Sequence, residues 1–348
     1  MSSVTTPKGV LLKSDTIASK FVDEVKTMLG ARPRRPKLVG ILSTSSAPSL
    51  SYANFTRKQC DALGIDFELK ETGAALGGEG AEGEGVEEAI IEANADPGVD
   101  GIMVYYPVFG AQQDHYLQQV VSPFKDVEGL NFKFHFNLYH NIRYLDPKSL
   151  TSAAPLTRYP EPTTGDIPPP GAVKSILPCT PLGVVKALEN IGVYNSLLPY
   201  GDRAYGKTVT VINRSEVVGR PLAALLANDG ACVFSVDINS IQVYTKRPDA
   251  RYFHPRHVVR PTPLSLEECL AQSDVVVSAV PGETYKVKTS ALKDGCVCIN
   301  VAADKNFEAD VREKASLYLP TVGKITILML LRNLLRLQEY QDLVRSQN

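Results

Sequence analysis

The feature of this 348-residue sequence that most constrains its fold is the alternation of short Val- and Ile-rich runs with helix-length segments. Several runs are apolar at nearly every position, which is typical of parallel strands buried on both faces of a sheet. Strands that alternate with helices favour an α/β fold with right-handed crossovers. The expected strands are 38–42, 101–106, 208–212, 232–236, 274–280 and 296–301. The expected helices are about 49–63, 86–95, 181–190, 218–227, 264–272 and 325–344.

A chain of this length is expected to form two domains. We expect the first to span residues 1–176, completed by the C-terminal segment 318–348, and the second to span 177–317. Two stretches interrupt the rhythm of strands and helices. Residues 145–171 are rich in proline, serine and threonine and indicate an extended linker or surface insertion. Residues 238–263 are polar, aromatic and basic and interrupt a strand–helix unit.

Composition excludes several classes of function. A net charge of -1 provides no basic field for nucleic acid or an anionic membrane. No apolar run reaches membrane-spanning length. The N-terminus resembles neither a signal peptide nor a presequence, which favours a cytoplasmic protein. Six cysteines form no CxxC pair and are expected to be free thiols, and with five dispersed histidines they predict no metal site.

Residues 206–226, GKTVTVINRSEVVGRPLAALL, read as a strand, a tight loop and a helix. Such a turn presents backbone N–H groups and a helix N-terminus to a pyrophosphate. The loop has one glycine where the GxGxxG fingerprint has three, so a plain strand–helix turn remains an alternative. The residues expected to contact a dinucleotide here are Arg214, Ser215, Val218 and Gly219.

The next strand leads to Asp237, 22 residues after Ser215. An acid at this position accepts hydrogen bonds from the adenosine ribose hydroxyls and repels a 2′-phosphate, which favours NAD as the cofactor. Two alternatives stay open at this point. Asp237 could simply begin a loop, and Arg214 could pair with a 2′-phosphate, contact the pyrophosphate or lie in solvent.

A second loop follows the strand expected at 274–280 and ends in a glycine. Glycine at such a position lets the backbone approach a cofactor closely, although an ordinary turn would look the same. The residues expected to contact the cofactor there are Ala279, Val280, Pro281 and Gly282.

These motifs, with four others in the same order, resemble the methylenetetrahydrofolate dehydrogenase/cyclohydrolase family. The nucleotide loop is similar to the family's GKxxxVxGRSxxVGxPxxxLL pattern. The other matches are SLSYANFTRKQCDALGI (49–65), PFKDVEGLN (123–131), LPCTPLG (177–183) and VGKITILMLLRN (322–333). The resemblance covers almost the whole chain apart from the two interrupting stretches.

The resemblance implies two domains around a cleft, with folate bound on the N-terminal side and NAD in a Rossmann-like second domain with a mostly parallel sheet. It also implies a homodimer and a place in one-carbon metabolism, including purine biosynthesis. Tyr52 corresponds to the family's cleft tyrosine, which packs on the pterin. Asp126 corresponds to an aspartate that accepts hydrogen bonds from pterin nitrogens, as a bidentate acceptor can. The family's PGGVGP loop is reduced here to residues 320–324, which leaves Pro320 and Gly323 as expected substrate contacts.

Two departures concern the catalytic apparatus. Thr56 occupies the family's catalytic-lysine position, four residues after Tyr52 and therefore on the same helix face. Lys58 matches a second family lysine and is expected to face elsewhere. Tyr105 stands where the family has a cleft glutamine.

The chemistry indicates which activity these departures remove. Oxidising the methylene group requires hydride transfer between two positioned groups, without a proton donor. Hydrolysis of the methenyl product requires positioned acid–base groups. We therefore expect NAD-dependent oxidation of 5,10-methylenetetrahydrofolate to the methenyl form, without cyclohydrolase activity, unless Tyr105 or Lys324 compensates. The alternatives are a bifunctional NADP enzyme, a non-catalytic folate- or nucleotide-binding regulator, and an unrelated dehydrogenase.

Overall fold

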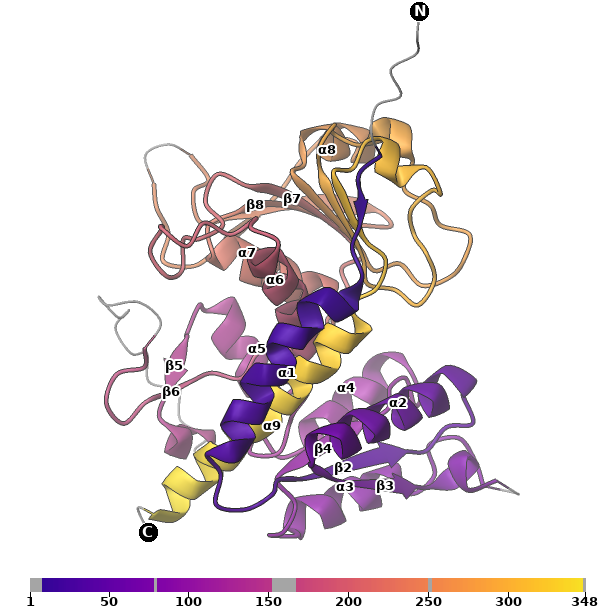
Figure 1. The fold of residues 1–348 in the computed structure, drawn as a ribbon, viewed down its shortest axis with the longest axis vertical. Coiled ribbons are helices and arrows are strands. Elements are labelled where there is room, and N and C mark those ends of the chain that lie inside the picture. Colours follow the sequence, from indigo (N-terminus) through magenta and orange to yellow (C-terminus); the bar gives the residue numbers. More distant parts are fainter. Residues whose placement is uncertain (1–7, 78–79, 152–166, 250–251, 347–348) are drawn as a thin grey trace, which may run out of the picture.

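The computed structural model describes residues 8–77, 80–151, 167–249 and 252–346. It contains two α/β units joined by long helices that cross between them (Figure 1). The upper unit in that view is built on a large sheet, and the lower unit on a small one. The predicted α/β class, with a mostly parallel sheet in the nucleotide-binding half, is confirmed.

The small sheet has the strand order β3-β2-β4, and all of its pairs are parallel. Its strands are β2 (Lys37–Leu42), β3 (Asp66–Glu71) and β4 (Gly101–Val104). The helices around it are α2 (Ala47–Leu63), α3 (Val86–Ala95) and α4 (Ala111–Val120). The next helix, α5 (Phe132–Tyr139), instead packs on a helix of the other half, α7 (Gly219–Asn228). All four residues of β4 are buried, as expected for a strand covered on both faces.

The large sheet has eight strands in the order β1-β13-β12-β11-β7-β8-β9-β10. Its strands are β1 (Val10–Leu11), β7 (Thr208–Ile212), β8 (Cys232–Asp237), β9 (Ser240–Thr245), β10 (Val258–Pro261), β11 (Val275–Ser278), β12 (Val297–Asn300) and β13 (Leu317–Leu319). The helices of this half are α6 (Cys179–Asn190), α7 (Gly219–Asn228) and α8 (Leu266–Gln272). A two-stranded ribbon, β5 (Tyr144–Leu145) with β6 (Val173–Lys174), precedes them in the chain.

Two long helices connect the halves. Helix α1 (Ser14–Gly30) lies against α9 (Gly323–Ser346), and α9 also packs on α6 (Figure 1). Most of α9 is buried because α1, α6 and the small sheet cover different faces of it. The expectation that the final helix folds back on the first domain is thus met by the structure.

The large sheet does not follow the predicted division of the chain. Strand β1, from the segment assigned to the folate-binding half, pairs in parallel with β13 and forms one edge of the nucleotide-binding sheet. The other edge comes from residues 238–263, which were expected only to interrupt a strand–helix unit. They form the antiparallel strands β9 and β10 beside β8. Of the proline-rich stretch 145–171, residues 152–166 lie outside the described part of the chain.

Other expectations concerned thiols and membranes. All six cysteines are free, as predicted, and five of them are buried. No helix in the described ranges is long and apolar enough to cross a membrane.

Candidate functional site

Helix α2 places Tyr52 and Thr56 on one face, as their spacing predicts. The helix has a proline in its first turn and ends at Gly64 in a left-handed conformation. The Thr56 side chain is fully buried, and its hydroxyl donates a hydrogen bond to the carbonyl oxygen of Tyr52 at 2.9 Å. Lys58 is exposed. The predicted difference in orientation between Thr56 and Lys58 is therefore present.

Tyr105 follows β4 and joins this group. Its ring meets that of Tyr52 edge-on, with centroids 6.2 Å apart and an interplanar angle of 84°. The Tyr105 hydroxyl is buried close to Thr56 but has no hydrogen-bond partner in good geometry among the described residues. Burial raises the pKa of both tyrosines, so both phenols are neutral near pH 7. Thr56 and Tyr105 are buried, Tyr52 is partly exposed, and none of these three side chains carries an ammonium group.

Asp126 is tied into its own turn. One carboxylate oxygen accepts the backbone N–H of Gly129 at 2.9 Å, and the other accepts the N–H of Asn131 at 2.6 Å. The residue is only 3% exposed. Burial raises the pKa of Asp126 to about 6, against the opposing effect of these N–H groups. The turn thus uses part of the acceptor capacity of this carboxylate, which has about four lone-pair sites.

Glu128, two residues later, was missed by the sequence analysis. One of its side-chain oxygens accepts the N–H of Val104 at 3.2 Å. The Glu128 carboxyl group lies close enough to Tyr52, Tyr105 and Cys179 for its charge to raise the pKa of each of them. Burial first, and the neighbouring Asp126 second, raise the pKa of Glu128 to about 8. The signal was available in the sequence, because the KDVEG segment contains two acids.

The conformation of the loop after β7 depends on Asn213 and Gly219. Asn213 has a φ of 89°, a left-handed value that asparagine tolerates better than most residues. Its side chain accepts the N–H of Ser215 at 2.7 Å and donates to the carbonyl of Ala279 at 2.9 Å. A Cβ on Gly219 would lie 1.6 Å from the carbonyl oxygen of Asn213, so only glycine fits there. The Ser215 hydroxyl accepts the N–H of Val218 at 3.2 Å, at the start of α7.

Arg214 and Asp237 line one pocket with a volume of about 980 Å³, near the upper end for small-molecule sites. Ser215, Val280 and Pro281 line it too, so the structure brings together residues predicted from three separate segments. Asp237 is exposed at the end of β8. The pocket's size, its acid at the strand end and its glycine-dependent loop suit a dinucleotide.

The arginine in this pocket is held by the large sheet. Arg214 Nε donates to the Ser235 hydroxyl at 3.0 Å, and Nη2 donates to the Ser235 carbonyl. Arg214 Nη1 donates to the Ser240 hydroxyl at 2.9 Å. Ser240 begins β9, so the stretch that interrupts the sequence pattern fixes this guanidinium in place.

The loop after β11 is supported by another residue that the sequence analysis missed. Asn306 accepts the N–H of Val280 at 3.0 Å and donates to the Val280 carbonyl at 2.9 Å. Gly282 has a φ of 97° and donates its N–H to Asp304 at 3.1 Å. The segment from Ala279 to Gly282, with Pro281 at the pocket wall, is therefore held at the carboxyl ends of β7 and β11.

The segment before α9 contains the last predicted contacts. The Pro320 carbonyl accepts a hydrogen bond from Asn300 at 3.3 Å, and α9 begins at Gly323. Lys324 forms an ion pair with Asp15 of α1. Since its amine is directed to that helix, Lys324 does not join the tyrosine cluster. Within the described ranges, no group of His, Cys, Asp and Glu could hold a metal ion.

Comparison with family models gives two matches. Residues 12–128 match the tetrahydrofolate dehydrogenase/cyclohydrolase catalytic domain, and residues 178–250 match the NAD(P)-binding domain of the same family.

Comparison with individual proteins gives matches over nearly the full length. The chain is 47% identical to a methylenetetrahydrofolate dehydrogenase [NAD(+)] of Schizosaccharomyces pombe, over 93% of this chain and 92% of that protein. It is 30% identical to a bifunctional protein FolD of Halalkalibacterium halodurans, over 93% and 97%. The solved structure of the NAD-dependent 5,10-methylenetetrahydrofolate dehydrogenase from Saccharomyces cerevisiae has a TM-score of 0.84 and 44% identity, covering 97% of this chain and 100% of that one.

Proposed function

The chain belongs to the tetrahydrofolate dehydrogenase/cyclohydrolase family, and we propose that it oxidises 5,10-methylenetetrahydrofolate to 5,10-methenyltetrahydrofolate with NAD as the hydride acceptor and without cyclohydrolase activity. One observation carries this proposal. An acid ends β8 at the dinucleotide pocket, in a molecule whose group of Tyr52, Thr56 and Tyr105 contains no lysine.

The reaction depends more on the positioning of substrate and cofactor than on proton transfer. The methylene carbon of the substrate lies between two nitrogens, whose lone pairs stabilise the cation left when hydride departs. Bound NAD supplies the nicotinamide ring that accepts the hydride. The residues of the chain therefore act by holding the substrate carbon about 3–3.5 Å from that ring and by excluding water. The ring of Tyr52, which is partly exposed, offers a flat apolar surface on which a pterin can stack, and the buried Tyr105 ring supports it edge-on.

The preference for NAD follows from Asp237 and Arg214 together. The Asp237 carboxylate can accept hydrogen bonds from ribose hydroxyls and repels a 2′-phosphate. Arg214 could in principle pair with that phosphate. However, its Nε and Nη2 groups bind Ser235 and its Nη1 group binds Ser240, which leaves few of its donors for a ligand.

Loss of the hydrolytic step follows from Thr56 and Tyr105. Attack by water on the methenyl carbon and cleavage of a C–N bond both require proton transfer, which a positioned acid–base group accelerates by about 10²–10⁴-fold. Thr56 is committed to the Tyr52 carbonyl, and Tyr105 is a neutral phenol. Lys324 is paired with Asp15 on the surface. None of these groups supplies the missing amine.

For the folate contact itself, we assign the principal acid to Glu128. Asp126 already receives two backbone N–H groups, whereas Glu128 faces Tyr52. Donation of pterin N–H groups to the Glu128 carboxylate would satisfy a buried acid whose pKa is raised in the free protein. Asp126 then orders the turn that carries Glu128.

The test is a two-cofactor assay that follows reduced cofactor and methenyl product separately. We expect NAD to be reduced, NADP to be a poor substitute, and the methenyl product to disappear only at its spontaneous rate. A preference for NADP, or methenyl hydrolysis faster than in an enzyme-free control, would instead support a bifunctional enzyme.

Three further parts of the proposal concern the oligomeric state, the cellular location and the metabolic pathway of the enzyme. We propose a cytoplasmic homodimer that supplies one-carbon units to purine biosynthesis. Family resemblance supports the dimer and the pathway. Analytical ultracentrifugation, cell fractionation and a purine requirement after gene deletion test the three parts separately.

A further inference from the structure

A second pocket lies away from the dinucleotide and shares no lining residue with it. Helices α5, α6, α7 and α9, strand β6 and the segment 200–203 contribute to its wall. Its volume is about 100 Å³, several times the roughly 30 Å³ occupied by one water. Drug-sized ligand sites begin near 300 Å³. The pocket therefore suits one compact group, and a whole nucleotide would not fit.

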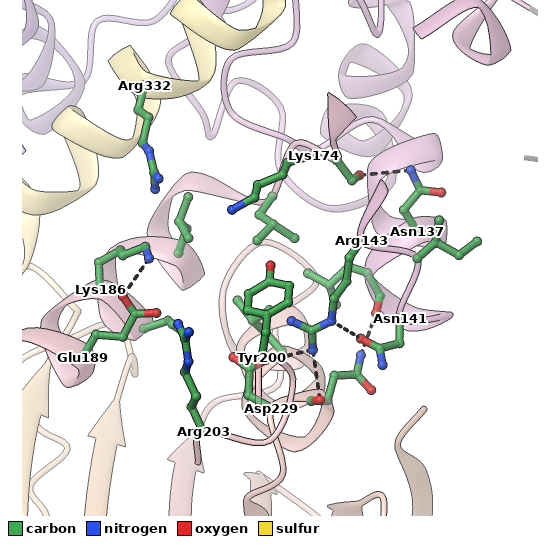
Figure 2. Close-up of a pocket in the computed structure, with 18 of the residues that line it drawn as sticks. Asn137, Asn141, Arg143, Lys174, Lys186, Glu189, Tyr200, Arg203, Asp229 and Arg332 are labelled. Carbon is green, nitrogen blue, oxygen red and sulfur yellow. Dashed lines mark hydrogen bonds and ion pairs between the residues drawn. The ribbon is translucent and has the colours of Figure 1, made fainter. Parts of the chain in front are cut away.

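The lining is strongly basic. It contains six cationic side chains and two carboxylates, a formal excess of four positive charges. The cations are Arg143, Lys174, Lys186, Arg203, Arg332 and Arg336. Figure 2 shows the labelled members of this group arranged around the ring of Tyr200, on segments from both halves of the molecule.

The nearby acids neutralise only part of this charge. Arg143 pairs with Asp229 at 2.8 Å, and Lys186 pairs with Glu189 at 2.6 Å. Outside the pocket, Glu24 of α1 lies 2.8 Å from Arg332. Within the described part of the chain, neither Arg203 nor Arg336 forms an ion pair with a carboxylate.

Two observations show that positive charge remains unsatisfied. The Nε atom of Arg203 is buried and has no hydrogen-bond partner among the described residues, a condition that destabilises the folded state. Burial, and after it the neighbouring Arg336, lower the pKa of Arg332. The centroid of the Tyr200 ring lies 4.8 Å from Arg143, 5.5 Å from Lys174 and 5.7 Å from Arg203. The face of this ring attracts the three cations, which would otherwise repel one another.

We propose that this pocket binds a phosphate group, carried either by inorganic phosphate or by a small phosphate ester. Guanidinium groups bind phosphate through paired N–H donors, and a tetrahedral dianion can receive donors from several directions at once. Arg332 and Arg336 lie on α9, and Arg203 lies in the segment between α6 and β7. A bound phosphate would thus link the helix that completes the folate half to the nucleotide half.

The test is isothermal titration calorimetry of inorganic phosphate into the whole protein saturated with NAD, at constant ionic strength set with chloride. Saturating NAD occupies the pyrophosphate loop, so binding there cannot mimic the signal. We expect saturable binding and a rise in melting temperature with phosphate, as mass action requires of a ligand that binds the folded state. Absence of saturable binding, or its loss when NAD is added, would overturn the proposal.

Variants locate the site. Arg336→Gln and Arg203→Gln should each weaken phosphate binding at least about tenfold, which corresponds to about 1.4 kcal/mol. Arg345→Gln is the matched control on the same helix, because Arg345 lies outside the pocket and pairs with Asp342. It should bind phosphate as the unmodified protein does. Equal binding by all three variants would show that the phosphate sits elsewhere.

A comparison of ligands identifies the source of the phosphate. Tighter binding of inorganic phosphate than of methyl phosphate would indicate the free ion, and equal or tighter binding of the ester would indicate a metabolite. Circular dichroism of each variant confirms that it is folded before binding is compared.

Discussion

The carboxyl group of Glu128 lies close enough to that of Asp126 for the Asp126 charge to raise the Glu128 pKa, although burial contributes more. The two acids are separated by one residue and have opposite surroundings. Asp126 accepts two backbone N–H groups of its own turn, whereas Glu128 accepts the N–H of Val104 and lies near the rings of Tyr52 and Tyr105. We therefore propose that the same short motif supplies one acid that orders the turn and one that binds the folate.

Replacing these two acids should therefore have different consequences. In Asp126→Asn, the new NH₂ group must face an N–H donor of Gly129 or Asn131, so we expect a loss of about 1–3 kcal/mol in unfolding free energy. Glu128→Gln should unfold at a similar denaturant concentration but show a raised KM for the folate. Chemical denaturation and steady-state kinetics measure the two effects. The assignment fails if Asp126→Asn is as stable as the unmodified protein.

Glu128 should also impose a pH dependence on kcat/KM, which reports groups of the free enzyme. Its pKa is raised from the usual value to about 8, so below that pH most molecules carry a protonated Glu128, which is a poorer acceptor for pterin N–H groups. We expect kcat/KM to rise with pH, by up to about tenfold per unit, and to level off above about pH 8. In Glu128→Gln this rise should vanish. A similar rise in that variant would assign the titration to another group.

The dinucleotide loop should not tolerate a side chain at Gly219. In Gly219→Ala the new Cβ would collide with the Asn213 carbonyl oxygen, so the loop must shift. We expect NAD binding to weaken at least about tenfold, or about 1.4 kcal/mol, as measured by fluorescence titration. Gly30→Ala, at the end of α1 with open space around its Cβ position, is the control. It should bind NAD normally.

Cofactor choice should depend on Asp237. Asp237→Ser removes a carboxylate from the pocket wall, so we expect the ratio of kcat/KM for NAD to that for NADP to fall at least about tenfold. Asp294→Ser, which removes an exposed acid outside this pocket, should leave the ratio unchanged. If both variants keep the original ratio, specificity resides in another residue.

Neither lysine near the family's catalytic motifs should serve the dehydrogenase. Lys58 is exposed on α2, and Lys324 pairs with Asp15. We expect Lys58→Met and Lys324→Met to retain kcat for NAD reduction within about twofold, since surface substitutions typically change free energies by less than about 0.5 kcal/mol. A large loss of kcat in either variant would reveal a lysine that reaches the substrate.

Much of the fold follows from local sequence. The apolar runs of β2, β7, β11 and β12 had to be buried, and the period of α2 placed Tyr52 and Thr56 on one face. Such patterns can be recognised from residues that are close together in the sequence. Helix α1 was not anticipated, and its main partner, α9, is distant in the chain. Strand β9 was also missed, although it pairs with its chain neighbour β8, because its polar and apolar residues were interpreted as part of an interruption.

By itself, the sequence determined the α/β class, the order of the motifs, the acid at position 237 and the absence of lysine at position 56. The tertiary structure decided which of the two acids at positions 126 and 128 lies near Tyr52, where Arg214 is held, and which helices gather the cations around Tyr200. The physical reason is that orientation and charge environment depend on contacts between segments far apart in the chain. A sequence motif shows which side chains are present, but the packing of distant segments determines which atoms each of those side chains contacts.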